Sequence, residues 1–259
     1  MARNFKRVLT IGDLHCGHRV GLTPPEFDFA QENDRWYRIR REMWNAYRDA
    51  IDAIQPIDVM LVNGDAIDGK GEKSGGTELI EADRLKQCKM AESALLYPQA
   101  DTVAMTYGTM YHVGTSEDLE SVLAENMGAT IGSHEWFKIN GTTFDLKHKI
   151  GSSSIPHGRA TPLAKDRLWN YIWSEFEEQP KADIIIRSHV HYFCAYLEDN
   201  FLAVTLPALQ GQGSKFGARI CSGTVHFGIV WFDCYDDGGY TWSWKVIRVQ
   251  SQKRKAVEL

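Results

Sequence analysis

Short apolar segments that end directly on carboxylate or imidazole side chains recur along this chain of 259 residues. The segments 7–11 and 57–62 each run into a Gly-Asp pair, and the segment 183–187 runs into His189. Apolar runs of this length, bounded by turn residues, are typical of buried strands. In open α/β sheets the ligand crevice lies beyond the carboxyl ends of the strands. The chain is therefore expected to be an α/β protein whose functional groups lie at one edge of its sheets.

Helical and strand patterns alternate along the chain. The first half reads as strand–helix–strand units, whereas the second half is richer in antiparallel strand pattern, and Asn140-Gly141 predicts a hairpin turn. No internal repeat or linker interrupts the pattern, so residues 1–259 are predicted to form a single domain. Helices are expected over 36–54, 78–96, between Ser116 and Gly128, and over 163–178, and strands over 7–11, 57–62, 102–106, 135–139, 142–147, 183–187, 201–206, 224–232 and 240–249.

The composition argues against several classes of protein. Apolar residues make up 43% of the chain and charged residues 24%, as in an ordinary soluble globular protein. No apolar run approaches the roughly 18 residues of a membrane span, and the start of the chain lacks the pattern of a cleavable signal, so a cytoplasmic protein without a membrane partner is expected. The net charge of −5 disfavours a broad basic face for nucleic acid. No two of the five cysteines stand at CxxC spacing, which argues against a sulfur zinc site.

Five loops at predicted strand ends carry the strongest chemical signal. They read GDLHCGH, NGDAID, YGTMYHVG, LKHK and RSHVH, and they hold six of the nine histidines. A lone Gly-Asp pair is commonly a turn, and one histidine in a loop is usually without function, but turns alone do not explain five such loops in order. The loops lie 36 to 52 residues apart, which leaves room for a helix or hairpin to return the chain to the same edge. The candidate functional residues are Asp13, His15, Asp65, His112, His148, His189 and His191.

These side chains have the chemistry of a transition-metal site. Carboxylates and imidazoles together are hard-to-borderline ligands that suit Mn²⁺, Fe or Zn²⁺ better than Ca²⁺. The pairs Asp13-x-His15 and His189-x-His191 can each aim two side chains at one place, because alternate residues of an extended segment face the same way. A carboxylate can bridge two ions about 3.5–4 Å apart, which suits in-line attack of water on phosphorus. The residues therefore indicate metal-dependent hydrolysis of a phosphoester.

In their order, the five loops resemble the motifs of the calcineurin-like metallophosphoesterases, which read roughly GDxHxxH, GDxxD, GNHD or GNHE, a lone His, and GHxH. The resemblance runs from residue 8 to about residue 193. It implies a four-layer αββα sandwich of two mixed β-sheets flanked by helices, with a dinuclear centre of two divalent ions, Mn²⁺ in first place and Fe, Zn²⁺ or Ni²⁺ as alternatives. Carried over by position, it implies a first ion at Asp13, His15 and His191, a bridging Asp65, and a second ion at His148 and His189.

The third loop departs from the family pattern. Thr109 stands where the family has an Asn ligand of the second ion, and the histidine comes four residues after Gly108 instead of two. We expect His112, presented in a loop, to protonate the leaving oxygen; the alternative is a histidine that only supports a ligand or the loop. The hydroxyl of Thr109, a water or nothing replaces the Asn. Asp68 and Asn63 are further candidates for holding an ion or for orienting a metal-bound histidine.

The substrate is less closely defined by the sequence. Arg159, with His157 nearby, is a candidate contact of the substrate phosphate, because guanidinium groups suit phosphate. Phosphoserine and phosphothreonine phosphatases of the family carry an Arg after the second motif, where this chain has Gly69-Lys70, so that activity is disfavoured. The leading hypothesis is a phosphodiesterase acting on a small or nucleotide-like diester. The alternatives are a nuclease of the Mre11 or SbcD type, with DNA or RNA as its partner, and a non-catalytic binding module of the same fold.

Overall fold

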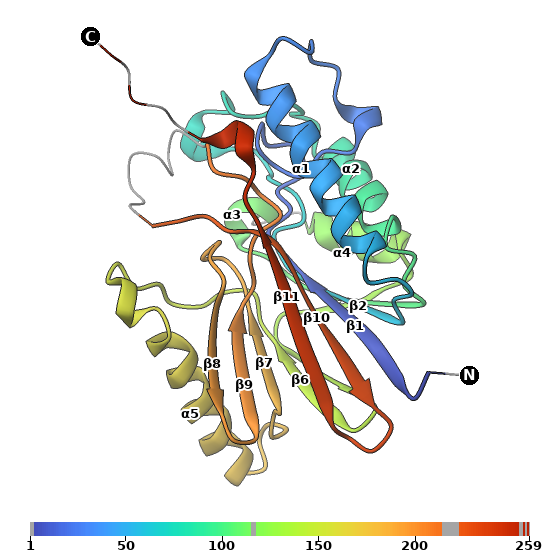
Figure 1. Cartoon of the computed structure of the whole chain (residues 1–259), viewed down its shortest axis with the longest axis vertical. Coiled ribbons are helices and arrows are strands. Elements are labelled where there is room, and N and C mark those ends of the chain that lie inside the picture. Colours follow the sequence, from blue (N-terminus) through green and yellow to red (C-terminus); the bar gives the residue numbers. More distant parts are fainter. Residues whose placement is uncertain (1–2, 115–117, 214–222, 254–255, 257, 259) are drawn as a thin grey trace.

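Two β-sheets pack face to face and carry helices on their outer faces (Figure 1). The computed structural model describes residues 3–114, 118–213, 223–253, 256 and 258. Within these residues the first sheet has the strand order β11-β10-β1-β2-β3-β4 and the second has the order β5-β6-β7-β9-β8. The first sheet comprises β1 (Phe5–Ile11), β2 (Val59–Asn63), β3 (Thr102–Thr106), β4 (Thr130–Gly132), β10 (Phe227–Tyr235) and β11 (Tyr240–Ile247). The second comprises β5 (Glu135–Ile139), β6 (Thr142–Leu146), β7 (Ile184–Arg187), β8 (Cys194–Glu198) and β9 (Phe201–Thr205).

Both sheets are mixed. The strands β1 to β4 run parallel, while β10 and β11 continue that sheet as antiparallel neighbours of β1. In the second sheet β6, β7 and β9 are parallel, and the edge strands β5 and β8 are antiparallel. The carboxyl ends of β1, β2, β3, β6 and β7 therefore carry the loops that the sequence singled out.

The helices complete a four-layer arrangement. The helices α1 (Arg35–Asp52), α2 (Arg84–Leu96) and α4 (Leu119–Asn126) pack on the first sheet, and α5 (Thr161–Glu175) packs on the second. A single turn, α3 (Met110–Val113), follows β3, and short 3₁₀ turns span Pro25–Phe27, Glu72–Ser74, Pro156–Gly158 and Gln250–Gln252. The expected α/β sandwich of two mixed sheets flanked by helices is confirmed.

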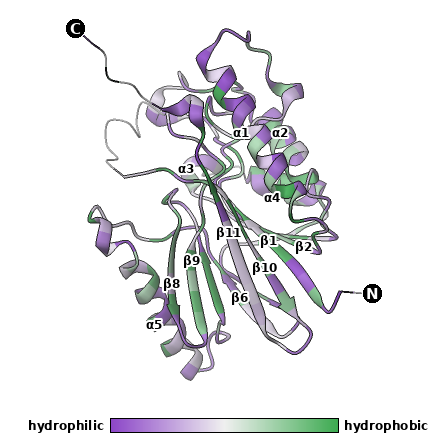
Figure 2. Cartoon of the chain, viewed as in Figure 1, coloured by the Kyte–Doolittle hydropathy of each residue, from purple (hydrophilic) through white to green (hydrophobic). Residues whose placement is uncertain are grey.

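Because successive side chains of a strand point to opposite faces, the apolar residues are divided between separate cores. Val8 and Leu61 face the second sheet, whereas Leu9 and Met60 face the helices of the first. In β7, Ile185 turns toward α5 while its neighbours turn toward the first sheet. Strands buried on both faces need nearly continuous apolar sequence, which explains the runs from which they were predicted. In Figure 2, β9 is mostly green along its length, whereas the helices carry both purple and green stretches.

The helix predicted over 78–96 is shorter than expected. It begins at Arg84, where the side chain of Asp83 accepts hydrogen bonds from two main-chain N–H groups of the first turn. The preceding residues pair instead with the loop after β1: Arg19 donates to the carbonyl of Glu78, and Ile80 donates to the carbonyl of Gly17. This non-local pairing satisfies backbone groups that a longer helix would have satisfied.

Several other differences from the prediction concern elements with weak local signals. The short strands β4 and β8 were not predicted, and the sequence did not show that the C-terminal hairpin of β10 and β11 continues the first sheet. His112 lies in α3 and not in an irregular loop. The helix α4 is capped by Asp118, whereas the predicted cap Ser116 lies outside the described residues.

No helix among the described residues is both long enough and apolar enough to cross a membrane. The cysteines that the structure describes, at positions 16, 88, 194 and 234, are free thiols, and Cys221 lies outside the described residues.

Candidate metal centre

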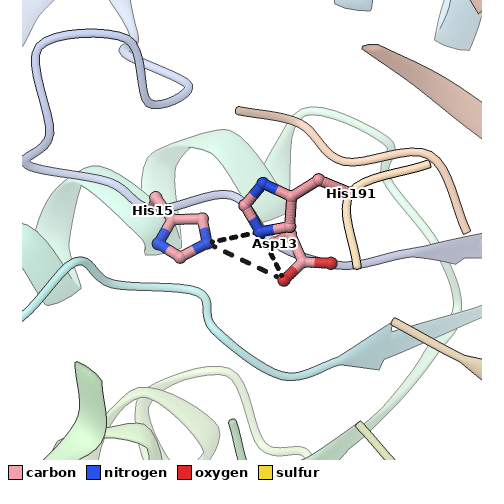
Figure 3. Close-up of side chains that lie close together, drawn as sticks. All are labelled: Asp13, His15 and His191. Atoms are coloured by element: carbon pink, nitrogen blue, oxygen red, sulfur yellow. Dashed lines mark hydrogen bonds and ion pairs between the residues drawn. The ribbon is translucent and has the colours of Figure 1, made fainter. Parts of the chain in front are cut away.

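The six predicted metal ligands converge at one end of the sandwich, where loops from both sheets meet. Together with His112, these side chains form three groups of possible ligand atoms, each with all atoms within 4.8 Å of one another. The first group is Asp13, His15 and His191 (Figure 3). The second group is Asp65, His148 and His189, and the third group is His15, Asp65 and His112. Since Asp65 approaches His15 as well as His148, it joins the first group to the second.

The backbone at these positions is held in an unusual conformation. Asp13, His15, Asp65, His189 and His191 all have positive φ angles, between 47° and 73°. For residues other than glycine this region is sparsely populated and costs on the order of 1–3 kcal/mol at each position. Five of the six predicted ligands share this conformation, which turns their side chains inward directly after the strands end. Concentrated strain of this kind is typical of a functional site.

Two glycines allow the loops to approach one another. A Cβ atom on Gly108 would lie 2.1 Å from Oδ1 of Asp65, so any side chain there would displace the central carboxylate. Gly64 has a φ of 73°, and a Cβ there would lie 2.6 Å from Nδ1 of His148. The glycines that the sequence places beside the candidate ligands are therefore required by close packing within the site.

The first group is tightly spaced and largely buried. Nε2 of His191 lies 3.2 Å from Oδ1 of Asp13, and Nε2 of His15 lies 3.2 Å from the same nitrogen of His191 (Figure 3). Nδ1 of His15 donates to Oδ1 of Asp68 at 3.1 Å, which leaves Nε2 of the neutral imidazole free to act as a ligand. A carboxylate behind a ligating histidine is the usual way in which proteins fix its ring and tautomer.

In the second group, a main-chain carbonyl orients the imidazole of His148. Nδ1 of His148 donates to the carbonyl oxygen of Asn63 at 2.7 Å, so its Nε2 points to Oδ2 of Asp65 at 3.0 Å. The side chain of Asn63 bonds elsewhere, to Ser188 and Thr106. Asn63 thus orients the histidine with its carbonyl group and not with its amide.

Thr109, at the position of the family's Asn, directs its hydrogen-bonding groups to Asp65. Its main-chain N–H donates to Oδ1 of Asp65 at 2.7 Å, and its hydroxyl lies 3.2 Å from the same atom. The main-chain N–H of His189 donates to the other buried carboxylate, Oδ2 of Asp13, at 2.9 Å. The Thr109 hydroxyl also lies 3.4 Å from Oδ2 of Asp65, the oxygen that faces His148, whereas the bond from His189 leaves Oδ1 of Asp13 unused.

Two buried polar atoms support a cation in this site. Among the described residues, Oδ1 of Asp13 and Nε2 of His148 are shielded from solvent and form no hydrogen bond. An unpartnered buried polar group costs about 1–3 kcal/mol, more when it is charged. Both atoms point toward the other ligand atoms of their groups. The donor set of imidazole nitrogen and carboxylate oxygen fits divalent transition metals, so the residues present fit the two ions implied by the family resemblance.

The carboxylates and imidazoles shift one another's pKa values. Burial lowers the pKa of His15, but the neighbouring carboxylates of Asp13 and Asp68 outweigh it and raise the pKa to about 10. For His148 the lowering by burial is outweighed by Asp65, which raises its pKa to about 9. Burial would raise the pKa of Asp13 and of Asp65, yet the surrounding histidines hold both below the ordinary range. Without metal, protons therefore occupy His15 and His148 and must leave when ions bind.

His112 faces the same centre from α3. Its Nδ1 donates to the main-chain carbonyl of Asp68 at 2.7 Å, and its Nε2 lies 3.9 Å from Oδ2 of Asp65. Its ring packs edge-on against that of His15, with centroids 4.4 Å apart. Burial, followed by the charge of His15, lowers the pKa of His112. The shifted spacing of the third loop thus still brings this imidazole to the site, through one helical turn.

The predicted substrate contacts are not brought into the ligand groups. The guanidinium of Arg159 lies over the ring of Tyr192, 4.4 Å from its centroid, and donates to Thr224 at 3.2 Å. Because Tyr192 follows His191 directly, Arg159 lies beside the loop of the first group. His157 is exposed in the 3₁₀ turn that precedes Arg159, and it belongs to none of the three ligand groups.

Two buried side chains behind the centre were not singled out from the sequence. The carboxylate of Glu120 accepts the N–H of Ala66 at 2.7 Å and that of Gly108 at 2.6 Å, which clamps the second loop to the third. Burial, followed by the charge of Asp65, raises the pKa of Glu120 to about 7. Gln87 holds Gly69 through both its N–H and its carbonyl group. For Glu120 a signal existed, since it shares the apolar face of α4 with residues 123 and 124.

Five ligand-bearing loops at one end of an αββα sandwich are what the sequence resemblance implied, and both features are present. The chain has the metallophosphoesterase fold.

No family model and no curated protein matches the sequence. Among solved structures, Vps29 from Cryptosporidium parvum is similar over 95% of this chain and 99% of its own, with 13% identity and a TM-score of 0.47.

Two further solved structures have comparable similarity. An archaeal phosphodiesterase is similar over 93% of this chain and 99% of its own, with 15% identity and a TM-score of 0.47. Wild-type Vps29 from Entamoeba histolytica, in complex with Zn²⁺, is similar over 93% of this chain and 98% of its own, with 16% identity and a TM-score of 0.43. Because these scores are low, the fold assignment rests on the topology and ligand geometry of this chain.

Proposed function

We propose that this protein is a metal-dependent phosphoester hydrolase that acts on a small or nucleotide-like phosphodiester. The observation that carries the proposal is the joined pair of ligand groups, in which Asp65 approaches His15 on one side and His148 on the other. The unpartnered atoms of Asp13 and His148 add a physical reason for cations to bind there.

Each residue has a definite part in this proposal. Asp13, His15, His191 and Asp65 would hold one ion, and Asp65, His148 and His189 would hold the other. When bound, such ions supply Lewis acidity, which lowers the pKa of water and offsets the charge of phosphate oxygens.

His112 would donate a proton to the leaving group. Because its Nδ1 already donates to the carbonyl of Asp68, the atom of His112 that can pass a proton to a leaving oxygen is Nε2. Nε2 faces Asp65, so the proton would be delivered next to the bridging carboxylate. Positioned proton transfer of this kind contributes roughly 10²–10⁴-fold in rate.

The proposal is tested by hydrolysis of bis-p-nitrophenyl phosphate and p-nitrophenyl phosphate by the Mn²⁺-loaded protein. The expected result is cleavage of the diester in preference to the monoester, with loss of activity in His189→Ala and a smaller loss in His112→Ala. Absence of hydrolysis in a protein that binds two ions would contradict it. A nuclease would instead cleave single-stranded DNA or RNA oligonucleotides, with an affinity that falls steeply as salt rises.

One observation favours a non-catalytic binding module as a second candidate. Thr109 directs its hydroxyl and its N–H to Asp65, so the third loop presents no amide oxygen to an ion. The same assay separates the candidates, because a binding module would take up metal without cleaving either ester.

A further inference from the structure

The helix α5 contacts the second sheet through polar as well as apolar side chains. Leu163 and Asn170 are buried, and Asn170 bonds to two main-chain groups of the segment before β7, at 3.0 Å each. The side chain of Asp166 accepts a hydrogen bond from Arg187 at 2.7 Å, and the guanidinium of Arg167 lies over an aromatic ring of β9. The inner face of α5 is therefore occupied mainly by bonded polar groups.

The outer face of the same helix is apolar. In Figure 1, α5 is the outermost element on the second sheet. Its outer apolar side chains form two rows at four-residue spacing, and together we call them the α5 stripe: Leu168 (58% exposed), Trp169 (49%), Ile172 (half-buried), Trp173 (43%) and Phe176 (70%). Helices of globular proteins normally turn such a stripe toward the core. Here the stripe faces away from the sheet, which makes it a candidate binding surface.

The area of the α5 stripe is that of an interface. A large apolar or aromatic side chain presents about 150–250 Å² when fully exposed, and these side chains are roughly half exposed, so together they leave about 400–500 Å² in water. A standard protein interface buries about 800 Å² on each partner, of which about 60% is apolar. The stripe therefore supplies the apolar part of one side of such an interface.

The shape of the stripe suits another helix. Leu168, Ile172 and Phe176 follow one another at intervals of four residues and form one ridge, while Trp169 and Trp173 form the next. Helices pack by placing the ridges of one into the grooves of the other. An identical helix brings a matching pair of ridges, so the stripe can pack against its own copy.

The charges at the ends of the stripe select the direction of that copy. Lys165 lies one turn before Trp169, and Glu175 lies one turn after Ile172. Both are exposed, and neither forms an ion pair with any residue that the structure describes. An antiparallel copy brings Lys165 of each chain near Glu175 of the other, whereas a parallel copy would bring like charges together.

The charges near the end of α5 also argue against a lipid surface as the occupant. Helices that lie on membranes usually carry Lys and Arg around their apolar face, because the headgroups that attract them are anionic. At the end of α5 stand three exposed carboxylates instead, those of Glu175, Glu177 and Glu178.

We propose that the α5 stripe binds the α5 stripe of a second copy of this chain, with the two helices antiparallel about a two-fold axis. Contact of one surface with itself is what a two-fold axis requires, and most homodimers are built in this way. The inference is independent of the proposed function, because no residue of the stripe belongs to a ligand group.

The test is sedimentation equilibrium of the Mn²⁺-loaded full chain between about 1 and 100 µM, a range that covers typical affinities of reversible dimers. The wild type is expected to show twice the mass of one chain. In Trp169→Gln each dimer loses two tryptophans from its interface, so the dimer should dissociate at least about a hundredfold more readily. The matched control is Trp244→Gln, since Trp244 is 50% exposed but lies on β11, in the first sheet, and this variant should remain dimeric.

A charge exchange tests the antiparallel direction. Lys165→Glu and Glu175→Lys should each weaken the dimer about tenfold, because each change replaces two attractive pairs by two repulsive ones. The double variant Lys165→Glu/Glu175→Lys restores opposite charges and should recover the wild-type affinity. These changes leave α5 intact, since acidic residues suit the start of a helix and basic residues its end.

Three results would overturn the proposal. The first is a wild type that stays monomeric up to 100 µM, and binding of that monomer to phosphatidylcholine vesicles would then assign the stripe to a lipid surface. The second is a dimer of equal strength in Trp169→Gln and Trp244→Gln, which would place the interface elsewhere. The third is a double charge variant that is as weak as both single variants, which would exclude the antiparallel pairing.

Discussion

The first and second ligand groups are built from similar side chains but are supported differently. In the first group His15 is backed by a carboxylate, Asp68, whereas in the second group His148 is backed by a neutral main-chain carbonyl. The second group also contains the position where Thr109 replaces the family's Asn, and the hydrogen bonds of Thr109 go to Asp65. In the proposed two-ion centre the first group would thus have a stronger support and the full ligand set that the resemblance implies, while the second would be one ligand short.

This difference leads to a specific expectation about affinity. An imidazole that donates to a carboxylate is a more basic ligand than one that donates to a carbonyl group. A missing ligand further weakens the second ion without removing it. We therefore expect the first ion to bind more tightly than the second.

The largest effect is expected from removing one histidine of either group. His15→Ala and His148→Ala should each bind one ion fewer and lower kcat for bis-p-nitrophenyl phosphate about 10³-fold, because an ion supplies several kcal/mol of charge stabilisation. Steady-state kinetics with metal analysis of the same samples checks this. The control is His134→Ala, since His134 contacts Asp145 and Trp136 outside the ligand groups. Full activity in either ligand variant would show that the group concerned is not catalytic.

A smaller effect is expected from weakening the support of the first group. Asp68→Asn keeps the size of the side chain but removes the charge that receives the proton of His15, and it should weaken the first ion about 10–100-fold. Calorimetric titration with Mn²⁺ resolves the two ions. Asp101→Asn, at an exposed position, is the matched control. Equal weakening of both ions would contradict the assignment of Asp68 to the first group.

Restoring an asparagine at position 109 tests whether the second group lacks a ligand. Thr109→Asn introduces the amide that the family resemblance implies, and it should strengthen binding of the second ion about tenfold, close to 1.4 kcal/mol. Thr109→Val is its counterpart, because it removes the hydroxyl and keeps the main-chain N–H bond to Asp65. The same titration measures both variants. If Thr109→Val alone abolishes the second ion, the threonine hydroxyl is a ligand and the second group is not one short.

The smallest effect is expected in the pH dependence of the metal-free protein. The folded pKa values of His15 and His148, about 10 and about 9, lie above the ordinary value of 6.5. The stability that they contribute is fully present below about pH 6.5 and is lost as the pH rises through 9 to 10. In EDTA the Tm should therefore fall as the pH rises from 7 to 9.5.

The variant His148→Gln provides the comparison for this pH effect. It cannot carry the proton, so its Tm should fall less over the same interval than that of the wild type. A fall of equal size in both proteins would assign the pH dependence to groups outside the centre.

The sequence predicted the strands that lead to the site because their signal is local. A run buried on both faces must be apolar, and a Gly-Asp or His-x-His at its end is visible without knowledge of the fold. The range 102–106 agrees with β3 for this reason. By contrast, the start of α2 depends on Glu78 and Ile80 pairing with the loop after β1, a contact between segments some 60 residues apart.

The sequence predicted which side chains gather at the site, but it did not predict the contacts that support them. Nothing local shows that Asn63 acts through its carbonyl group or that Glu120 clamps two loops. Those relations depend on the packing of helices against loops from different strands. His112 is intermediate: its residue type suggested a function, and α3 provides the turn that brings it to Asp65.

The most direct test of a two-ion centre joined by Asp65 is the number of Mn²⁺ ions bound per chain, measured by metal analysis after equilibrium dialysis. Two ions are expected in the wild type and no more than one, bound weakly, in Asp65→Asn, since Asp65 is shared between the groups. A single ion in the wild type at saturating Mn²⁺, or two ions retained in Asp65→Asn, would contradict it.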